Sequence, residues 1–194
     1  ILEDPMSDFA TLSLDGSGLS RTPRVRASKR AEDYLDRFDS TTLWLDAVWH
    51  DGAVVLICPR LNNLDRSVAR ARFTLDGSEV RPRITRYYRH TLIRLRADVQ
   101  PSRVAVEVGD WRGETPVNGP DTRLDGRNVL MTLSKDNHPD WIEDWARFHA
   151  AHHGADAVIL DLEDSVPTDH KEAARALVAD KIAGLAAAGQ RVYV

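Results

Sequence analysis

The sequence of 194 residues contains a single cysteine, Cys58, so it cannot form an internal disulfide bond. On that ground we expect a reducing environment and a cytoplasmic location. No apolar stretch approaches the ~20 residues of a membrane span, and no signal peptide is visible. Gly-rich phosphate loops, internal repeats and low-complexity segments are also lacking. These absences exclude a disulfide-stapled secreted domain, an integral membrane helix and a repeat protein.

The composition that remains is that of a globular protein. Hydrophobic residues make up 42% of the chain, and the formal charge of -4 gives no global reason to expect nucleic acid or an anionic membrane as a partner. We therefore predict no nucleic-acid partner, and we leave an oligomer open. The chain starts at Ile1 and finishes in a strand-like run, residues 191–194, so we expect both ends to be cut.

The first part of the chain predicts a small antiparallel β unit. Residues 1–40 are rich in Ser, Gly, Asp and Arg, and we expect a mobile lead-in there. Within residues 41–108, strands are expected at residues 43–48, 54–58, 91–96 and 103–108, with hairpin turns at Asp51-Gly52 and around Asp76-Gly77. The last two of these strands alternate apolar and polar positions, so each should bury one face. Residues 109–127 carry several glycines and prolines with little periodicity, which indicates a linker and a domain boundary.

Residues 128–194 predict an incomplete α/β domain. Strands are expected at residues 128–133, 157–162 and 191–194, with helices at residues 139–153 and 170–188 between them. This β-α-β-α-β order requires parallel strands joined by right-handed crossovers, as at the start of a TIM-barrel-like or a Rossmann-like domain, here truncated. In both folds the chemistry lies at the carboxyl ends of the strands.

The first of these helices has a clear start and an aromatic stripe. Asn137 or His138 can cap it, and Pro139 is tolerated in its first turn. A stripe that includes Trp141, Trp145 and Phe148 is expected to be its buried face.

The most informative motif is acidic. A hydrophobic strand that starts at Ala157 delivers Asp161, Glu163 and Asp164 within four residues at its carboxyl end. Three crowded carboxylates repel one another unless a cation offsets them, and a hard cation such as Mg²⁺ suits oxygen ligands. The motif thus predicts a metal site formed by these three residues. The alternative is that Asp161 and Glu163 are solvated loop acids and Asp164 caps a turn.

The run His153-Gly-Ala-Asp-Ala-Val-Ile-Leu-Asp-Leu-Glu-Asp-Ser-Val-Pro resembles the HpcH/HpaI aldolase and citrate lyase β-subunit family, and the likeness extends over residues 152–194. The resemblance implies a Mg²⁺-dependent (β/α)8 barrel that cleaves a C–C bond in a β-hydroxy acyl-CoA such as citryl-CoA or malyl-CoA. It assigns Glu163 and Asp164 to the acidic motif near the metal. The Arg, Glu and Asp that the family supplies later in its sequence are missing from this chain.

A second resemblance covers residues 41–160. Residues 128–137, which run Asn-Val-Leu-Met-Thr-Leu-Ser-Lys-Asp-Asn, are similar to bacterial glycosyltransferases of capsular-polysaccharide type, as is the stretch from Leu43 to Arg60. This likeness implies a nucleotide-sugar transferase with a Rossmann-like domain, although the Asp-x-Asp motif of that family is absent. The two resemblances meet near residues 154–160, as they would after a recombination, an assembly artefact or a fusion.

Our leading hypothesis is a partial C–C lyase of citrate lyase β-subunit type that is inactive as this fragment. Two strand-helix units cannot close an eight-stranded barrel. The alternatives are a glycosyltransferase fragment and a nonfunctional or purely binding chimeric fragment.

Three other groups of residues carry weaker signals. His149 and His153 lie four residues apart and could share a cation with His152 nearby, but surface histidines explain them more simply. Six arginines between residues 81 and 96 flank Tyr87 and Tyr88; they superficially suit RNA or sugar phosphate, but strand alternation favours a solvated face. Cys58, at the end of an apolar strand, is predicted to be a buried structural thiol.

Overall fold

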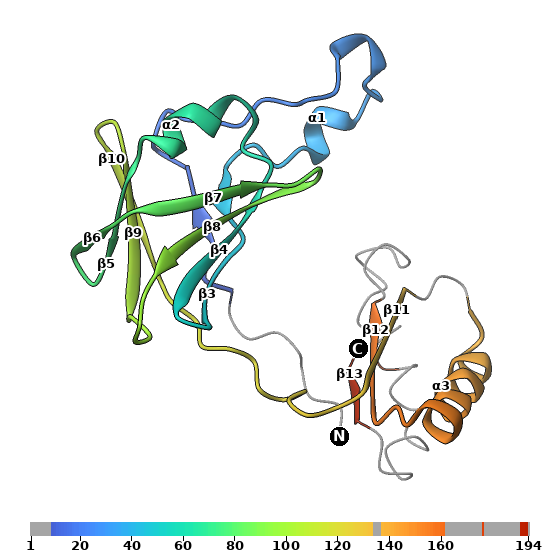
Figure 1. Cartoon of the computed structure of the whole chain (residues 1–194). Coiled ribbons are helices and arrows are strands. Elements are labelled where there is room, and N and C mark those ends of the chain that lie inside the picture. Colours follow the sequence, from blue (N-terminus) through green and yellow to red (C-terminus); the bar gives the residue numbers. More distant parts are fainter. Residues whose placement is uncertain (1–8, 134–136, 162–175, 177–190, 194) are drawn as a thin grey trace. The chain divides into compact units, whose positions relative to one another are not determined.

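The structure is a computed structural model that describes residues 9–133, 137–161, 176 and 191–193 (Figure 1). The chain divides into two compact units, which are described separately. One comprises residues 8–120, and the other comprises residues 121–194 together with residues 1–7.

The first unit consists mainly of antiparallel strands. In chain order these are β1 (Leu12–Ser13), β2 (Thr42–Trp44), β3 (Asp46–His50), β4 (Ala53–Pro59), β5 (Arg72–Leu75), β6 (Ser78–Val80), β7 (Pro82–Arg86), β8 (His90–Arg96), β9 (Arg103–Val108) and β10 (Trp111–Pro116). Short helices occur at Ala27–Lys29, α1 (Tyr34–Arg37), Asn62–Leu64 and α2 (Asp65–Ala69). The strands form a β3-β4-β8-β7 sheet, a β10-β9-β5-β6 sheet and a β1-β2 pair (Figure 1).

Both predicted hairpin turns are confirmed. Asp51 and Gly52 have φ angles of 50° and 73° between β3 and β4, and Asp76 and Gly77 have φ angles of 46° and 83° between β5 and β6. Positive φ at both central residues is the signature of the two-residue turn whose twist matches that of the flanking strands. The Asp-Gly pairs therefore set the register of both hairpins.

The two four-stranded sheets share one hydrophobic core. The β3-β4-β8-β7 sheet contributes Leu56, Ile93 and Leu95, and the other sheet contributes Phe73 and Val106, all with exposures of 1% or less. Successive residues of a strand face opposite sides, so their polar neighbours lie on the outer faces. The predicted antiparallel β unit is thus a two-sheet sandwich.

The sandwich extends beyond residues 41–108 at both ends. Leu12 and Leu14 are buried in the same core, so the structure differs from the expected mobile lead-in over these positions. Residues 111–116, expected to be linker, form β10, which pairs with β9 along its length. A Cβ at Gly113 would lie 2.6 Å from the Trp111 ring and 2.9 Å from Leu12, so this glycine serves close packing rather than a turn.

Cys58 lies fully buried in the core, as predicted for a structural thiol. Burial raises the pKa of its thiol to about 12, although the positive charge of Arg21 acts in the opposite direction. The thiolate is therefore suppressed at neutral pH, which argues against a nucleophilic role.

One carboxylate connects three segments of this unit. The Oδ1 atom of Asp46 accepts hydrogen bonds from the Ala10 amide at 3.0 Å, the Ala47 amide at 2.8 Å and the Asn118 side-chain amide at 2.9 Å. Asp46 is only 9% exposed. The carboxylate thus connects the segment before β1, strand β3 itself and the segment after β10.

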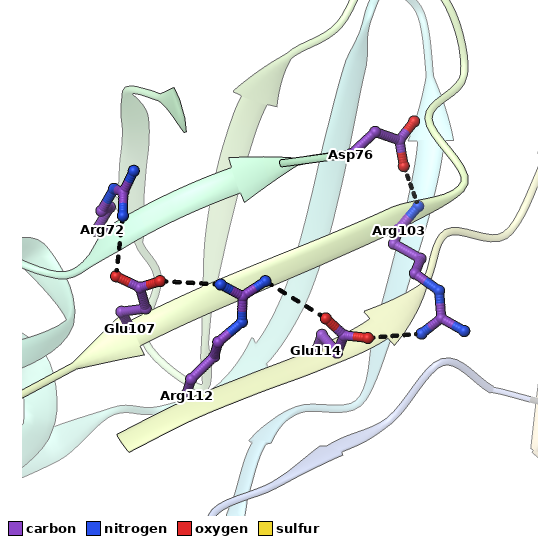
Figure 2. Close-up of polar contacts among 6 residues, drawn as sticks. All are labelled: Arg72, Asp76, Arg103, Glu107, Arg112 and Glu114. Atoms are coloured by element: carbon purple, nitrogen blue, oxygen red, sulfur yellow. Dashed lines mark hydrogen bonds and ion pairs between the residues drawn. The ribbon is translucent and has the colours of Figure 1, made fainter. Parts of the chain in front are cut away.

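The outer face of the β10-β9-β5-β6 sheet carries a chain of ion pairs (Figure 2). We call it the arginine–glutamate ladder. Its contacts are Arg72–Glu79 at 3.0 Å, Arg72–Glu107 at 3.3 Å, Arg112–Glu107 at 3.1 Å, Arg112–Glu114 at 3.5 Å and Arg103–Glu114 at 2.8 Å. Charges alternate along the whole chain, so each member has a neighbour of opposite sign.

The second unit has parallel strands. Strands β11 (Val129–Leu133), β12 (Ala157–Asp161) and β13 (Arg191–Tyr193) form a sheet in that order, and helix α3 (Pro139–His153) connects the first two. The predicted β-α-β unit is therefore seen over residues 129–161. The expected helix at residues 170–188 lies outside the described residues, apart from residue 176. Sequential strand order occurs in TIM barrels and in half of a Rossmann fold, so it does not separate them.

Helix α3 begins and ends as the sequence predicts, but its buried face differs. His138 is the N-cap and accepts from the Asp140 amide at 3.3 Å, while Gly154 ends the helix with a φ of 66°. The buried positions are Ile142 and Ala146, whereas Trp141 is 68% exposed and Phe148 is 54% exposed. The hydrophobicity of the aromatic stripe predicts a buried face, but the smaller side chains of Ile142 and Ala146 allow closer contact between helix and sheet.

We predict that Asp46→Ala lowers the free energy of unfolding by about 2–4 kcal/mol, because two buried backbone amides lose their acceptor. Asp46→Asn keeps a carbonyl oxygen at the same place and should cost about 1 kcal/mol or less. Urea denaturation of the two variants measures the difference. Equal losses in both would show that the charge, not the hydrogen-bond geometry, is what matters.

We further predict that Glu107→Gln costs about 0.5–1 kcal/mol at low ionic strength, because Glu107 bridges two arginines of the ladder. The loss should shrink in roughly 1 M NaCl, where charges are screened over a few ångströms. Glu79→Gln, at the exposed end of the ladder with one partner, is the matched control and should cost less. Urea denaturation midpoints at both salt concentrations measure the loss of stability in each variant. If the loss caused by Glu107→Gln is the same at both salt concentrations, the prediction is wrong.

Candidate functional site

The candidate site lies where β11 and β12 end. Their parallel register pairs Thr132 with Leu160 and Leu133 with Asp161, so both strands reach the same edge of the sheet together. In parallel α/β folds this edge is where ligands and catalytic groups gather. The sequence-predicted metal residue Asp161 is thus the last residue of a central strand, at the expected edge.

Buried apolar side chains hold that strand in place. Val158 and Leu160 pack against Ile142 and Ala146 of α3, and all four have exposures of 7% or less. Leu130 and Trp145 add partly buried contacts to the same cluster. Because the strand is anchored on this face, its carboxyl end is presented at a fixed position and cannot slide by one residue without exposing the cluster.

An open pocket of about 210 Å³ lies beside the end of β11. Thr132, Asn137, Trp141, Ile142 and Trp145 line it. Trp141 supplies a largely exposed indole face, and Thr132 and Asn137 supply polar groups at the rim. Small-molecule sites combine apolar walls with a few polar groups in this way, although usually at volumes of ~300–1,000 Å³.

The other face of the sheet is open among the described residues. Met131 is 68% exposed and Leu133 is 62% exposed, and both alternate with residues that face α3. In the part of the chain that the structure describes, no helix or strand covers them. Apolar side chains of this size at neighbouring positions of one strand normally lie against another layer of protein.

Of the three predicted metal-binding acids, only one lies among the residues that the structure describes. For Asp161 the backbone position is described, whereas Glu163 and Asp164 lie outside the described residues. Within residues 9–133, 137–161 and 191–193, no three His, Cys, Asp or Glu side chains gather as metal ligands. The proposed metal site therefore depends on the donor set that follows β12.

The histidines near the end of α3 form an aromatic cluster. The rings of His149 and His153 are 5.0 Å apart, and Phe148 lies 4.5 Å from His152 and 5.5 Å from His149. Trp145 contacts His149 edge to face at 5.1 Å. This end of the helix is opposite to its N-cap at the pocket, so the structure does not bring the histidines to the acidic strand end.

Sequence reasoning missed the pocket residues Thr132 and Trp141 as site candidates. The signal for Thr132 is a polar residue near the end of an otherwise apolar strand. The sequence predicts a core position for Trp141, and only the structure shows that this largely exposed residue borders the pocket. Among the described helices, none is long and apolar enough to cross a membrane.

The comparisons with known proteins support one of the two resemblances. A family model described as HpcH/HpaI aldolase/citrate lyase matches residues 135–194. Searches among curated proteins and among solved structures return no match. The glycosyltransferase resemblance of residues 41–160 finds no support, and the described strands up to residue 116 are antiparallel, unlike those of a Rossmann domain. The chain is thus similar to the aldolase and citrate lyase family over its last 60 residues.

Proposed function

We propose that residues 128–194 contribute to the site of a metal-dependent C–C lyase that acts on a β-hydroxy acyl thioester. The observation that carries this proposal is the position of Asp161 at the carboxyl end of a buried parallel strand, inside the segment that matches the aldolase and citrate lyase family. Citryl-CoA and malyl-CoA are the substrates to examine, since the resemblance implies them.

The donor set fits a hard divalent cation. Asp161, Glu163 and Asp164 would hold Mg²⁺ through carboxylate oxygens, the ligand type that this ion prefers. When bound, the cation would polarise a substrate carbonyl and stabilise negative charge that develops there. The role of this chain's own residues is to concentrate negative charge at the strand end and to bind the cation there.

The neighbouring pocket suits a different part of the substrate. Its apolar walls at Trp141 and Trp145 can bury carbon chain, and Thr132 can hydrogen-bond a polar group near the end of β11. Carbon–carbon cleavage also needs exclusion of water from the reacting atoms. Because Met131 and Leu133 are exposed, the described strands leave one side of the site open to water.

We therefore expect the 194 residues to bind a cation without turning over a thioester. The exposed face of β11 supports assignment of this sheet to a larger barrel, in which such side chains line the interior. The alternative is that this segment only binds another molecule or has no function. The effect of the cation on the Tm tests the proposed metal site.

We predict that Mg²⁺ binds with a dissociation constant in the millimolar range, about -4 kcal/mol, because three carboxylates leave several coordination positions to water. A cation at about 10 mM should raise the Tm of the full chain, by an amount that grows with concentration. Glu163→Ala should abolish the shift, whereas Glu143→Ala on α3 is the matched control and should keep it. Differential scanning fluorimetry at constant ionic strength measures both. If wild type and Glu163→Ala respond equally, the three acids are solvated loop residues.

A further inference from the structure

Strand β7 forms one edge of its sheet and carries arginines on its outer face. The strand order β3-β4-β8-β7 leaves β7 with a single neighbour, β8 (Figure 1). Arg83 of β7 pairs directly with Arg94 of β8, and Arg81 and Arg96 follow at the next outer-face positions, just before β7 and at the end of β8. Four arginines therefore face the same side of two adjacent strands.

These arginines are poorly compensated. The side chains of Arg83 and Arg94 make no hydrogen bond or ion pair with any residue that the structure describes. The Arg96 side chain meets only Asp98, at 3.5 Å, and both side chains are more than 80% exposed. Like charges directly opposite on neighbouring strands destabilise a sheet. Other outer-face residues near them include Val55 of β4, Leu92 of β8 and Thr85 of β7, which carry no charge and cannot offset that of the arginines.

The other sheet of the same unit shows the contrasting arrangement. In the arginine–glutamate ladder, Arg72 of β5 meets Glu79 of β6 on one side. On the other side it meets Glu107 of β9, as Figure 2 shows. There the strand next to each arginine supplies the acid. Next to β7 on its free side, no described strand supplies one. The unit as a whole is also cationic, with 18 Lys and Arg against 15 Asp and Glu over residues 8–120, a difference of +3.

The backbone of β7 can accept a further strand. The amide of Tyr87 donates to the carbonyl of His90 at 2.8 Å, which marks a hydrogen-bonded pair. Because such pairs alternate in antiparallel ladders, Thr85 and Arg83 also point their backbone groups toward β8. Ile84 and Arg86 then direct theirs to the free edge, where the described residues provide no partner. Pro82, which has no N–H, also occupies an outward position and costs the sheet nothing.

The side chains specify the kind of strand that fits. A strand added beside β7 would place alternate residues next to Arg83 on the outer face and next to Ile84 on the core side. Ile84 packs against the hydrophobic core as a partly buried residue, so its new neighbour should be apolar. The new neighbour of Arg83 should be acidic, and it would occupy a non-hydrogen-bonded position, where facing side chains come closest.

We propose that the free edge of β7 binds an extended acidic peptide in which Asp or Glu alternates with apolar residues, through addition of one antiparallel strand. The acids lie against Arg81 and Arg83, and the apolar residues extend the core beyond Ile84. A second copy of this edge does not meet the requirement, because Pro82–Arg86 contains no acid to place against Arg83. Charged residues on edge strands also prevent aggregation. If protection were the only role of these arginines, the acidic peptide would not bind at this edge.

The experiment uses the full chain and a fluorescein-labelled (Glu-Val)4 peptide in fluorescence anisotropy at low salt. We expect saturable binding that Arg83→Glu weakens by at least about tenfold, as expected when a charge-assisted contact is replaced by repulsion. Arg70→Glu makes the same charge change at an exposed position after α2 and should alter the affinity by no more than about twofold. A double variant, Arg83→Glu with Arg94→Glu, should instead bind (Lys-Val)4, and this gain of binding shows that the variant is folded.

A second peptide tests strand addition separately from charge. In (Glu-Val)4 with N-methylated valines, the charges are unchanged but the amides that would face Ile84 and Arg86 cannot donate, so binding should be lost. Failure of (Glu-Val)4 to bind, or equal binding of the methylated peptide, overturns the proposal. So does an equal loss in Arg70→Glu. Tighter, Arg83-dependent binding of an oligothymidylate of about 20 nucleotides would identify a single-stranded nucleic-acid surface instead.

Discussion

The carboxylate of Asp46 ties together the parts of the sandwich that are most distant in the sequence. One oxygen accepts from Ala10, from Ala47 and from Asn118, and it is nearly inaccessible to water. Buried backbone amides require an acceptor, and an ionised acceptor with three donors recovers much of what its own desolvation costs. The Trp44 indole lies nearby in the fold and donates to the Ala10 carbonyl, so the entry segment is held from both sides.

The two sheets of this unit satisfy charge in different ways. On one outer face, each arginine of the ladder pairs with a glutamate on an adjacent strand. The other gathers arginines at an edge where described acids are few. At the β7 edge, backbone N–H and C=O groups and arginine side chains can still bind a partner. On the ladder face, the charged side chains already pair with one another. Both faces belong to the same unit and both are exposed to solvent. Exposure to solvent alone therefore does not explain why the arginines beside β7 have so few acidic partners.

Local sequence signals predicted local structure well. The Asp-Gly turns, the limits of α3 and the strand at residues 157–161 follow from turn chemistry, capping and apolar runs, which act over a few residues. The ends of the sandwich could not be predicted in this way. Leu12 and Leu14 occupy a Ser- and Gly-rich segment, and their burial depends on partners more than 25 residues away. Gly113 indicated a loop because glycine favours turns, but the neighbouring Trp111 ring explains it. At the candidate site, position 161 was predictable from the apolar run, while the pocket depends on which way Trp141 points around a helix, and two tryptophans on one stripe do not reveal this.

The reach of Asp46 also bears on how the protein is made. Its third donor, Asn118, lies 72 residues downstream, and Asn118 also pairs with the backbone of β3 as an isolated bridge. The amino-terminal strands emerge from the ribosome long before that partner exists. Non-local pairings of this kind fold slowly, and a chain is synthesised at roughly 5–20 residues per second. For several seconds the growing sandwich therefore has hairpins but no closed core, and its exposed apolar strands are candidates for chaperone binding during translation.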